Sequence, residues 1–149
     1  MHAKTVGVDS AFVATLACDA LGPENVLCLF LPSIHSSNES EEDAKSLCHN
    51  LNCEIKIFSI IDIHKIVQRE LNNSLTINSF DITYDNIQAR IRGMILMAFS
   101  NKNNMLLLSC SNKSEIAIGY STIYGDTCGG FAPIGDIYKT TLYATKYKF

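Results

Sequence analysis

The chain has 149 residues, of which 47% are hydrophobic and 18% are charged. This length suits a single domain with its own hydrophobic core, and the balance of apolar and charged residues excludes a disordered chain. The net charge of −3 gives no general attraction for nucleic acid, so local groups must hold any anionic ligand. Apolar runs such as Val26–Leu31 are too short to span a bilayer, so we expect no membrane contact.

The six cysteines form no CxxC pair and lie at positions 18, 28, 48, 53, 110 and 128. Cys18 and Cys28 lie in apolar runs, where a cysteine acts as a small core residue. Asp9 and Asp19 interrupt the apolar stretch that a signal peptide would need. We therefore expect a cytoplasmic protein with reduced thiols rather than a disulfide framework.

Helices and strands alternate in the first half of the chain. After the turn Thr5–Ser10, apolar residues at helical spacing end at Gly22-Pro23, a helix stop signal. Ser40 is the expected cap of the next helix, because a serine hydroxyl can accept from a free N–H in the first turn. The patterns predict helices over 11–21, 40–51 and 61–71, and strands over 25–31 and 54–60.

The second half begins with the longest expected helix, which Thr83 caps and which ends near Ser100. Its core-facing stripe is expected to be Tyr84, Ile87, Ile91, Met94, Ile95 and Ala98. Met105–Leu108 has the length of a short buried strand, and residues 120–143 mix glycine with aromatic residues, as in an ordered loop. The alternation of strands and helices predicts an α/β fold with a mainly parallel sheet.

A polar turn follows the expected strand at Met105–Leu108. Ser109–Asn112 comes first, and Lys113 and Glu115 come next. Ligand sites in open α/β sheets lie at the carboxyl ends of the strands, which makes this turn a candidate site. A surface turn with a solvated lysine and glutamate is the alternative, and the residues alone leave both open.

Two other groups could bind an anion. Gly7 precedes an expected helix N-terminus, where free N–H groups suit phosphate. Asn86 and Arg90 lie four residues apart on one helix face, beside Gly93, and could bind carboxylate, phosphate or ribose. A turn that binds nothing and a solvated helix edge are the alternatives. The histidines without ligand spacing, interpreted as surface or hydrogen-bonded residues, are His35, His49 and His64.

Several motifs occur in order between Gly7 and about Lys139. They are Asn86–Gly93, Ser100–Lys102, Asn112–Glu115, Gly119-Tyr120, Tyr124–Asp126, Gly129–Ile134 and Asp136–Thr140. Together they resemble the NAD synthetase family, most closely the synthetase domain of its glutamine-dependent type. The resemblance implies a three-layer α/β/α, Rossmann-like fold of the adenine-nucleotide α-hydrolase kind, in the ATP pyrophosphatase group. GMP and argininosuccinate synthetase relatives fit residues 86–93 and 129–134 less well.

The resemblance also implies the chemistry of the last step of NAD biosynthesis. ATP would convert the carboxylate of deamido-NAD into an acyl-adenylate, and ammonia would then displace AMP. By the same resemblance, Asp9 and Glu115 would bind Mg²⁺ and form the catalytic set with Lys139. The residues for ATP would be Thr5, Val6, Gly7, Val8, Asp9, Ser10, Cys110 and Lys139. The residues for deamido-NAD would be Asn86, Arg90 and Glu115.

The sequence departs from the family pattern in three places, which are the turn at residues 5–10, the turn at residues 109–115, and Gly135. Val6 and Ser111 replace glycines, Cys110 replaces a hydroxyl that would contact ATP, and Gly135 replaces a lysine. We expect residues 1–149 to form one incomplete domain without the family's first strand, its C-terminal part or a glutaminase domain. Two hypotheses follow. One is a ligase that uses ammonia, free or from a glutaminase domain or chain. The other is a non-catalytic remnant or subunit that keeps the fold and some nucleotide affinity. A homo-oligomer or a complementing chain is expected.

Overall fold

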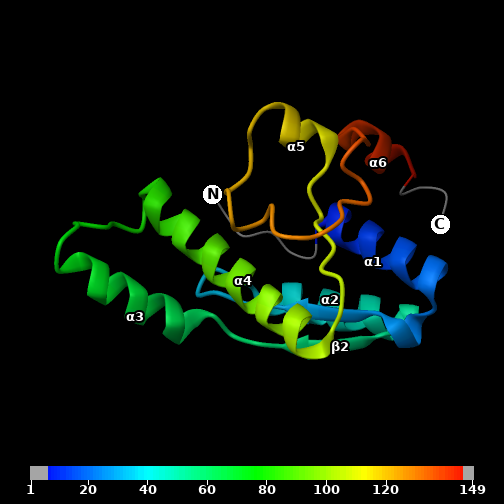
Figure 1. Ribbon diagram of the computed structural model, residues 1–149, viewed down its shortest axis with the longest axis horizontal. Helices are drawn as coiled ribbons and strands as arrows, with labels where there is room; N and C mark the ends of the chain where they lie inside the picture. Colours follow the sequence, from blue (N-terminus) through cyan, green and yellow to red (C-terminus); the bar gives the residue numbers. More distant parts are fainter. Residues whose placement is uncertain (1–6, 146–149) are drawn as a thin grey trace.

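The computed structural model describes residues 7–145, and within them two regular strands pair in parallel. These strands are β1 (Leu27–Phe30) and β2 (Glu54–Ile57), and Cys28 lies opposite Ile55. The helices are α1 (Val8–Leu21), the 3₁₀ turn η1 (Pro23–Asn25), α2 (Asn38–Leu51), α3 (Ile61–Asn72), α4 (Ile82–Asn103), α5 (Lys113–Ala117) and α6 (Lys139–Thr145). Figure 1 shows α2 and α4 on opposite sides of the strands. The expected α/β arrangement with parallel strands is confirmed.

Three helices begin earlier in the chain than expected. Helix α1 starts at Val8 with Gly7 as its N-cap, which places the expected phosphate-binding residues in its first turn. The cap of α2 is Ser37, whose Oγ accepts from the Ser40 N–H at 3.2 Å, while Ser40 is buried in the first turn. The N-cap of α4 is Asp81 rather than Thr83. In α2 and α4 the observed cap lies within one turn of the expected one, and tertiary packing decides which of the two is used.

The strands are shorter than expected. Pro23 starts the 3₁₀ turn that takes up the beginning of the expected first strand, and β2 ends before the bend into α3. The strand expected at Met105–Leu108 is wrong as a regular strand, since only Leu108 forms a bridge, with Phe131. Among the described residues this segment pairs on one side alone. A cavity of about 860 Å³ lies between it and β1, lined by residues such as Leu29 and Leu107.

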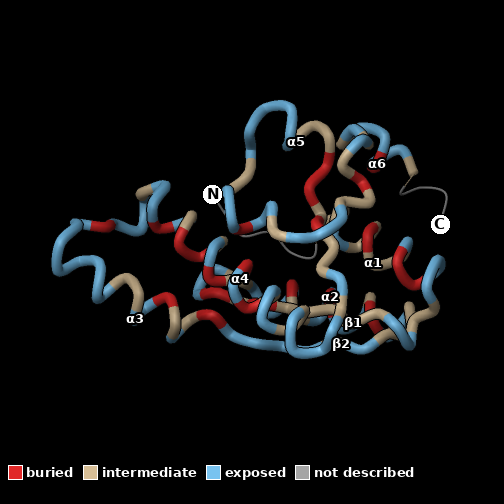
Figure 2. The backbone as a smooth tube through the Cα atoms, in the orientation of Figure 1, coloured by how far each residue is buried: buried red, intermediate tan, exposed pale blue. Residues whose placement is uncertain are grey.

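The main hydrophobic cluster lies where α3 and α4 pack beside the end of β1. It joins Leu31 and Ile60 to four residues of the expected stripe on α4, which are Tyr84, Ile87, Ile91 and Ile95. Met94 and Ala98 were wrongly placed in that stripe, because both are exposed and Gln88 and Gly93 are buried instead. Figure 2 shows the buried positions along α4 and along the segment that leads into α5. No helix within the described residues is both long and apolar enough to cross a bilayer.

His64 corrects the expectation that the histidines lie at the surface or are fully hydrogen-bonded. Its ring packs edge-on against Tyr84 with the centroids 4.4 Å apart, and the residue is buried. Its Nε2 atom has no hydrogen-bond partner among residues 7–145. Burial lowers the pKa of His64; a backbone hydrogen bond at Tyr84 opposes this shift in part, and the nearby charges of His35 and Arg92 lower the pKa further. The folded protein therefore holds His64 in its neutral form.

We expect the free energy of unfolding to fall as the pH drops below about 6.5, the pKa of an unfolded-state histidine. The unfolded chain binds a proton there that buried His64 rejects, so the unfolded state gains stability. Urea unfolding of the protein and of His64→Phe, measured between pH 8 and pH 5, checks this. The variant should show the smaller dependence on pH, and equal dependence in both proteins would contradict the account.

Candidate active site

The polar turn after Leu108 is a buried junction rather than a solvated loop. Asn112 is 0% exposed, and Ser109 and Ser111 are buried beside it. The Asn112 side chain accepts from the Glu115 N–H at 3.0 Å, and a Glu115 carboxylate oxygen accepts from the Asn112 N–H at 3.3 Å. This reciprocal capping box starts the short helix α5 and fixes the position of the Glu115 side chain.

Three charged side chains converge beside this junction. Asp9 comes from the first turn of α1, Glu115 from α5, and Lys139 from the start of α6. Lys139 Nζ forms an ion pair with Asp9 Oδ2 and lies 3.8 Å from Glu115 Oε1. Asn112 Nδ2 donates to the other Asp9 oxygen at 3.3 Å, and its backbone N–H donates to the Glu115 carboxylate, so Asn112 contacts both carboxylates. The structure therefore brings together all three residues expected to be catalytic.

The backbone also holds Lys139 in place. Its N–H donates to Ser114 Oγ at 3.1 Å, and the Lys113 N–H donates to the Ile137 carbonyl at 3.0 Å. Lys139 Nζ also lies over the Tyr143 ring, 5.9 Å from its centroid. These contacts join the beginnings of α5 and α6, so the lysine faces the carboxylates rather than bulk solvent.

The first turn of α1 meets the large cavity. Gly7 and Ser10 line it together with Cys110, and all three were expected to contact ATP. The N-terminus of a 14-residue helix presents free N–H groups and a partial positive charge to an anion. The Ser10 hydroxyl already donates a hydrogen bond within this turn, to the Gly7 carbonyl oxygen at 3.0 Å. Thr5 and Val6, also expected to contact ATP, lie outside the described residues.

Cys110 lies close to the acidic pair. Burial raises the pKa of its thiol to about 11, and the negative charges of Asp9 and Glu115 contribute. The side chain is therefore a neutral thiol at physiological pH, a weaker hydrogen-bonding group than the hydroxyl that the family pattern has there.

Asn86 and Arg90 lie on α4 and contact the loop 120–128 rather than the acidic pair. Thr122 Oγ1 donates to Asn86 Oδ1 at 2.7 Å, and Arg90 Nε donates to the Ile123 carbonyl at 3.2 Å. The same loop reaches the polar turn, because Ser111 Oγ donates to the Asp126 carbonyl at 3.4 Å. Two of the three residues expected for deamido-NAD therefore form a second group, joined to the first through this loop, while the third, Glu115, belongs to the first group.

Gly93 allows this loop to pack closely on α4. A Cβ atom at Gly93 would lie 2.8 Å from both the Tyr124 carbonyl oxygen and Cys128 Sγ. We expect Gly93→Ala to destabilise the protein by about 1 kcal/mol, because overpacking costs about 1–3 kcal/mol and the helix propensity of alanine returns only part of it.

Thermal unfolding checks this, with Gly135→Ala as the matched control. At Gly135 a Cβ atom would approach Ala132 at 3.3 Å, a contact that needs only a small adjustment. A Gly93→Ala protein as stable as the control would show that the loop is free to move away from α4.

Two residues that organise the site were not expected from the sequence to have a role there. Asn112 connects Asp9 to Glu115, and its spacing from Glu115 is the capping-box signal, which was visible in the sequence. Thr122 bonds to Asn86 across 36 positions of the chain, and no local pattern points to that contact.

The acidic pair fits a divalent cation by its donor chemistry. Asp9 and Glu115 offer hard carboxylate oxygens of the kind that Mg²⁺ prefers. Both approach a single positive group, the Lys139 ammonium, so two carboxylates already converge on one cation. One negative charge remains uncompensated within this trio, which favours a further cation.

Comparison with known proteins identifies the family of the chain. The family model described as NAD synthase matches residues 5–148. The glutamine-dependent NAD(+) synthetase of Aquifex aeolicus is 54% identical over 137 residues, which are 92% of this chain and 24% of that protein. This chain thus spans about a quarter of the length of the curated relatives it matches.

Two solved structures share the fold. The glutamine-dependent NAD+ synthetase from Acinetobacter baumannii, in complex with ADP, has a TM-score of 0.91 at 39% identity, covering 95% of this chain and 27% of that one. The NH3-dependent NAD synthetase from Campylobacter jejuni, in complex with the nitrate ion, has a TM-score of 0.86 at 41% identity, covering 97% and 61%. With the family match across nearly the whole chain, these likenesses establish that the chain belongs to the NAD synthase family.

Proposed function

We propose that this chain carries the catalytic site for ATP-dependent amidation of deamido-NAD to NAD. The observation that carries the proposal is the convergence of Asp9, Glu115 and Lys139 beside the N-terminus of α1 and the large cavity. Membership of the NAD synthase family supports it. The described cysteines are all free thiols, in keeping with a cytoplasmic enzyme.

The proposed binding roles follow the two groups of residues. Residues 7–10 and Cys110 bind ATP, with the first turn of α1 facing its phosphates, and we extend this assignment to Thr5 and Val6. Asn86, Arg90 and Glu115 bind deamido-NAD, and the loop 120–128 positions the first two. Asp9 and Glu115 hold Mg²⁺, which when bound supplies positive charge to the phosphates.

The proposed reaction has two steps. A carboxylate oxygen of deamido-NAD bonds to the α-phosphorus of ATP, and the bond to the β-phosphate breaks to release pyrophosphate. Ammonia then bonds to the acyl carbon and gives up a proton as AMP leaves with its bonding electrons. Lys139 is suited to the first step, because an ammonium that now neutralises Asp9 can instead stabilise the charge that develops on the departing phosphates.

Formation of NAD from deamido-NAD, ATP, Mg²⁺ and ammonium by the purified chain tests the proposal. The control is Glu115→Gln, which keeps the oxygen that caps α5 and removes the charge. We expect activity in the chain and a loss of about 100-fold or more in the variant. Equal activity in the two proteins would remove Glu115 from the mechanism.

A second candidate is a nucleotide-binding subunit that requires a complementing chain. The edge of β1 that faces the cavity has no strand partner within residues 7–145, and unpaired backbone groups favour addition of another segment. A folded chain that binds ATP without forming NAD would favour this candidate. In either case the ammonia is free or comes from a glutaminase domain or chain, and a homo-oligomer remains a proposal.

A further inference from the structure

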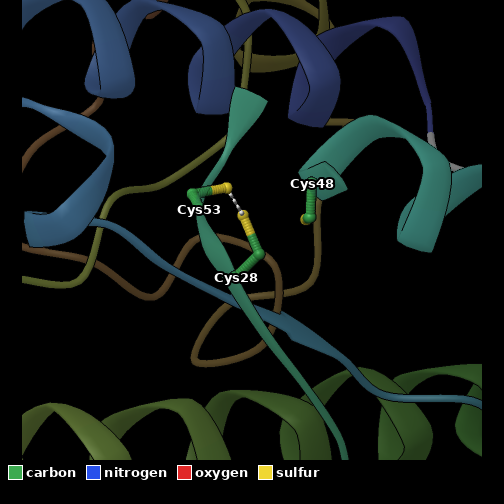
Figure 3. Close-up of side chains that lie close together, drawn as sticks. All are labelled: Cys28, Cys48 and Cys53. Carbon is green, nitrogen blue, oxygen red and sulfur yellow. Dashed lines mark hydrogen bonds between the residues drawn. The ribbon is translucent and has the colours of Figure 1, made fainter. Parts of the chain in front are cut away.

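Three cysteines outside the candidate active site gather at one end of the strands. Cys28 lies on β1, Cys48 in the last turn of α2, and Cys53 directly before β2. Their sulfur atoms all lie within 4.8 Å of one another, and the Cys28 and Cys53 sulfurs are 4.0 Å apart. Figure 3 shows these two sulfurs facing each other, with Cys48 on the neighbouring end of α2.

The turn between α2 and β2 creates this arrangement. Asn52 caps α2 in the left-handed conformation, with φ 56°, and the Cys53 N–H donates to the Cys48 carbonyl at 3.0 Å. The backbone reverses direction at Asn52, so the thiols of Cys48 and Cys53, five positions apart in the chain, lie close together. The parallel pairing of β1 with β2 then adds Cys28.

A fourth thiol lies beside the cluster. Cys18, buried on α1, has its pKa raised to about 11 by burial and by its neighbours Cys53 and Cys48. The cluster is also reachable, because Cys28 and Cys48 line the large cavity. Cys48 is 2% exposed, so a ligand there would be shielded from bulk water.

We propose that Cys28, Cys48 and Cys53 form a binding site for a thiophilic metal ion such as Zn²⁺. With Zn–S bonds of about 2.3 Å, the sulfurs around one ion lie roughly 3.8–4.0 Å apart, so the thiols need only small shifts to bind. Soft thiolates select such ions over Mg²⁺, which prefers oxygen. Binding releases the thiol protons to solvent.

Titration of the reduced, metal-free chain with Zn²⁺ tests the proposal. The titration uses protein prepared without a histidine tag. It contains excess Mg²⁺ and a chromophoric chelator that competes with the protein for Zn²⁺. We expect one equivalent bound, with three or four sulfur neighbours in the zinc X-ray absorption spectrum. Either of two results with the unchanged chain would overturn the proposal. One is a zinc shell of nitrogen and oxygen ligands, and the other is a chain that cannot compete with the chelator for Zn²⁺.

Variants identify the ligands. Cys28→Ser combined with Cys53→Ser should weaken Zn²⁺ binding at least 100-fold, and Cys128→Ser, which changes a cysteine outside the cluster, should not alter it. Glu115→Gln should also leave Zn²⁺ binding unchanged, which separates this site from the one proposed for Mg²⁺. If the double variant binds as tightly as the unchanged chain, the cluster is not the site.

Discussion

Replacing Asp9 with asparagine is expected to lower the rate of NAD formation by about 100-fold or more. The carboxylate pairs with Lys139 and accepts from Asn112, so the isosteric amide keeps the shape of the site and removes its charge. Losing one preorganised electrostatic group costs about 10²–10³ in kcat. Steady-state rates at saturating ATP and deamido-NAD measure the effect.

Asp19→Asn is the matched control for this prediction. Asp19 lies on the same helix as Asp9, is exposed, and should tolerate the change with the rate unaltered. Circular dichroism and thermal unfolding establish that both variants are folded. An Asp9→Asn protein that keeps a third or more of the original rate would show that the charge has no catalytic use.

Asn112→Ala is expected to reduce the free energy of unfolding by about 2–4 kcal/mol. The substitution removes the cap of α5, which accepts from the Glu115 N–H and is worth about 1 kcal/mol. It also leaves a partly buried oxygen of Asp9 without this donor, at a further cost of about 1–3 kcal/mol. Urea unfolding at neutral pH measures the loss.

Ser37→Ala separates the two contributions. Ser37 caps α2 with the same kind of bond, from the Ser40 N–H at 3.2 Å, but makes no contact with a charged group of the active site. Its loss should cost about 1 kcal/mol. Equal losses in the two variants would mean that Asn112 is only a helix cap and does not join Asp9 to Glu115.

The helices were largely predictable because their signals are local. The spacing of apolar residues predicted α3 over 61–71, and the structure has it at Ile61–Asn72. Where two cap candidates lie within one turn, as Ser37 and Ser40 do, the choice depends on which of them is buried by the rest of the fold. Starting points were therefore less predictable than the helices themselves.

Contacts between distant elements could not be derived from periodicity. Asp9 and Lys139 are 130 positions apart, and only the resemblance to a family placed them in one site. The cysteine cluster depends on the register of β1 with β2 and on the reversal at Asn52, neither of which the cysteine spacing reveals. Met105–Leu108 has the composition of a strand, but a regular strand also needs neighbouring strands to pair with. Within the described residues this segment forms only the single bridge between Leu108 and Phe131.

The most direct test of the central claim is exchange of labelled pyrophosphate into ATP, without ammonia. This half-reaction reports formation of the acyl-adenylate alone, at the site of Asp9, Glu115 and Lys139. We predict exchange that requires both deamido-NAD and Mg²⁺ and that Glu115→Gln abolishes. A folded chain that binds ATP and deamido-NAD yet shows no exchange, or exchanges equally well without deamido-NAD, would contradict the assignment of this site.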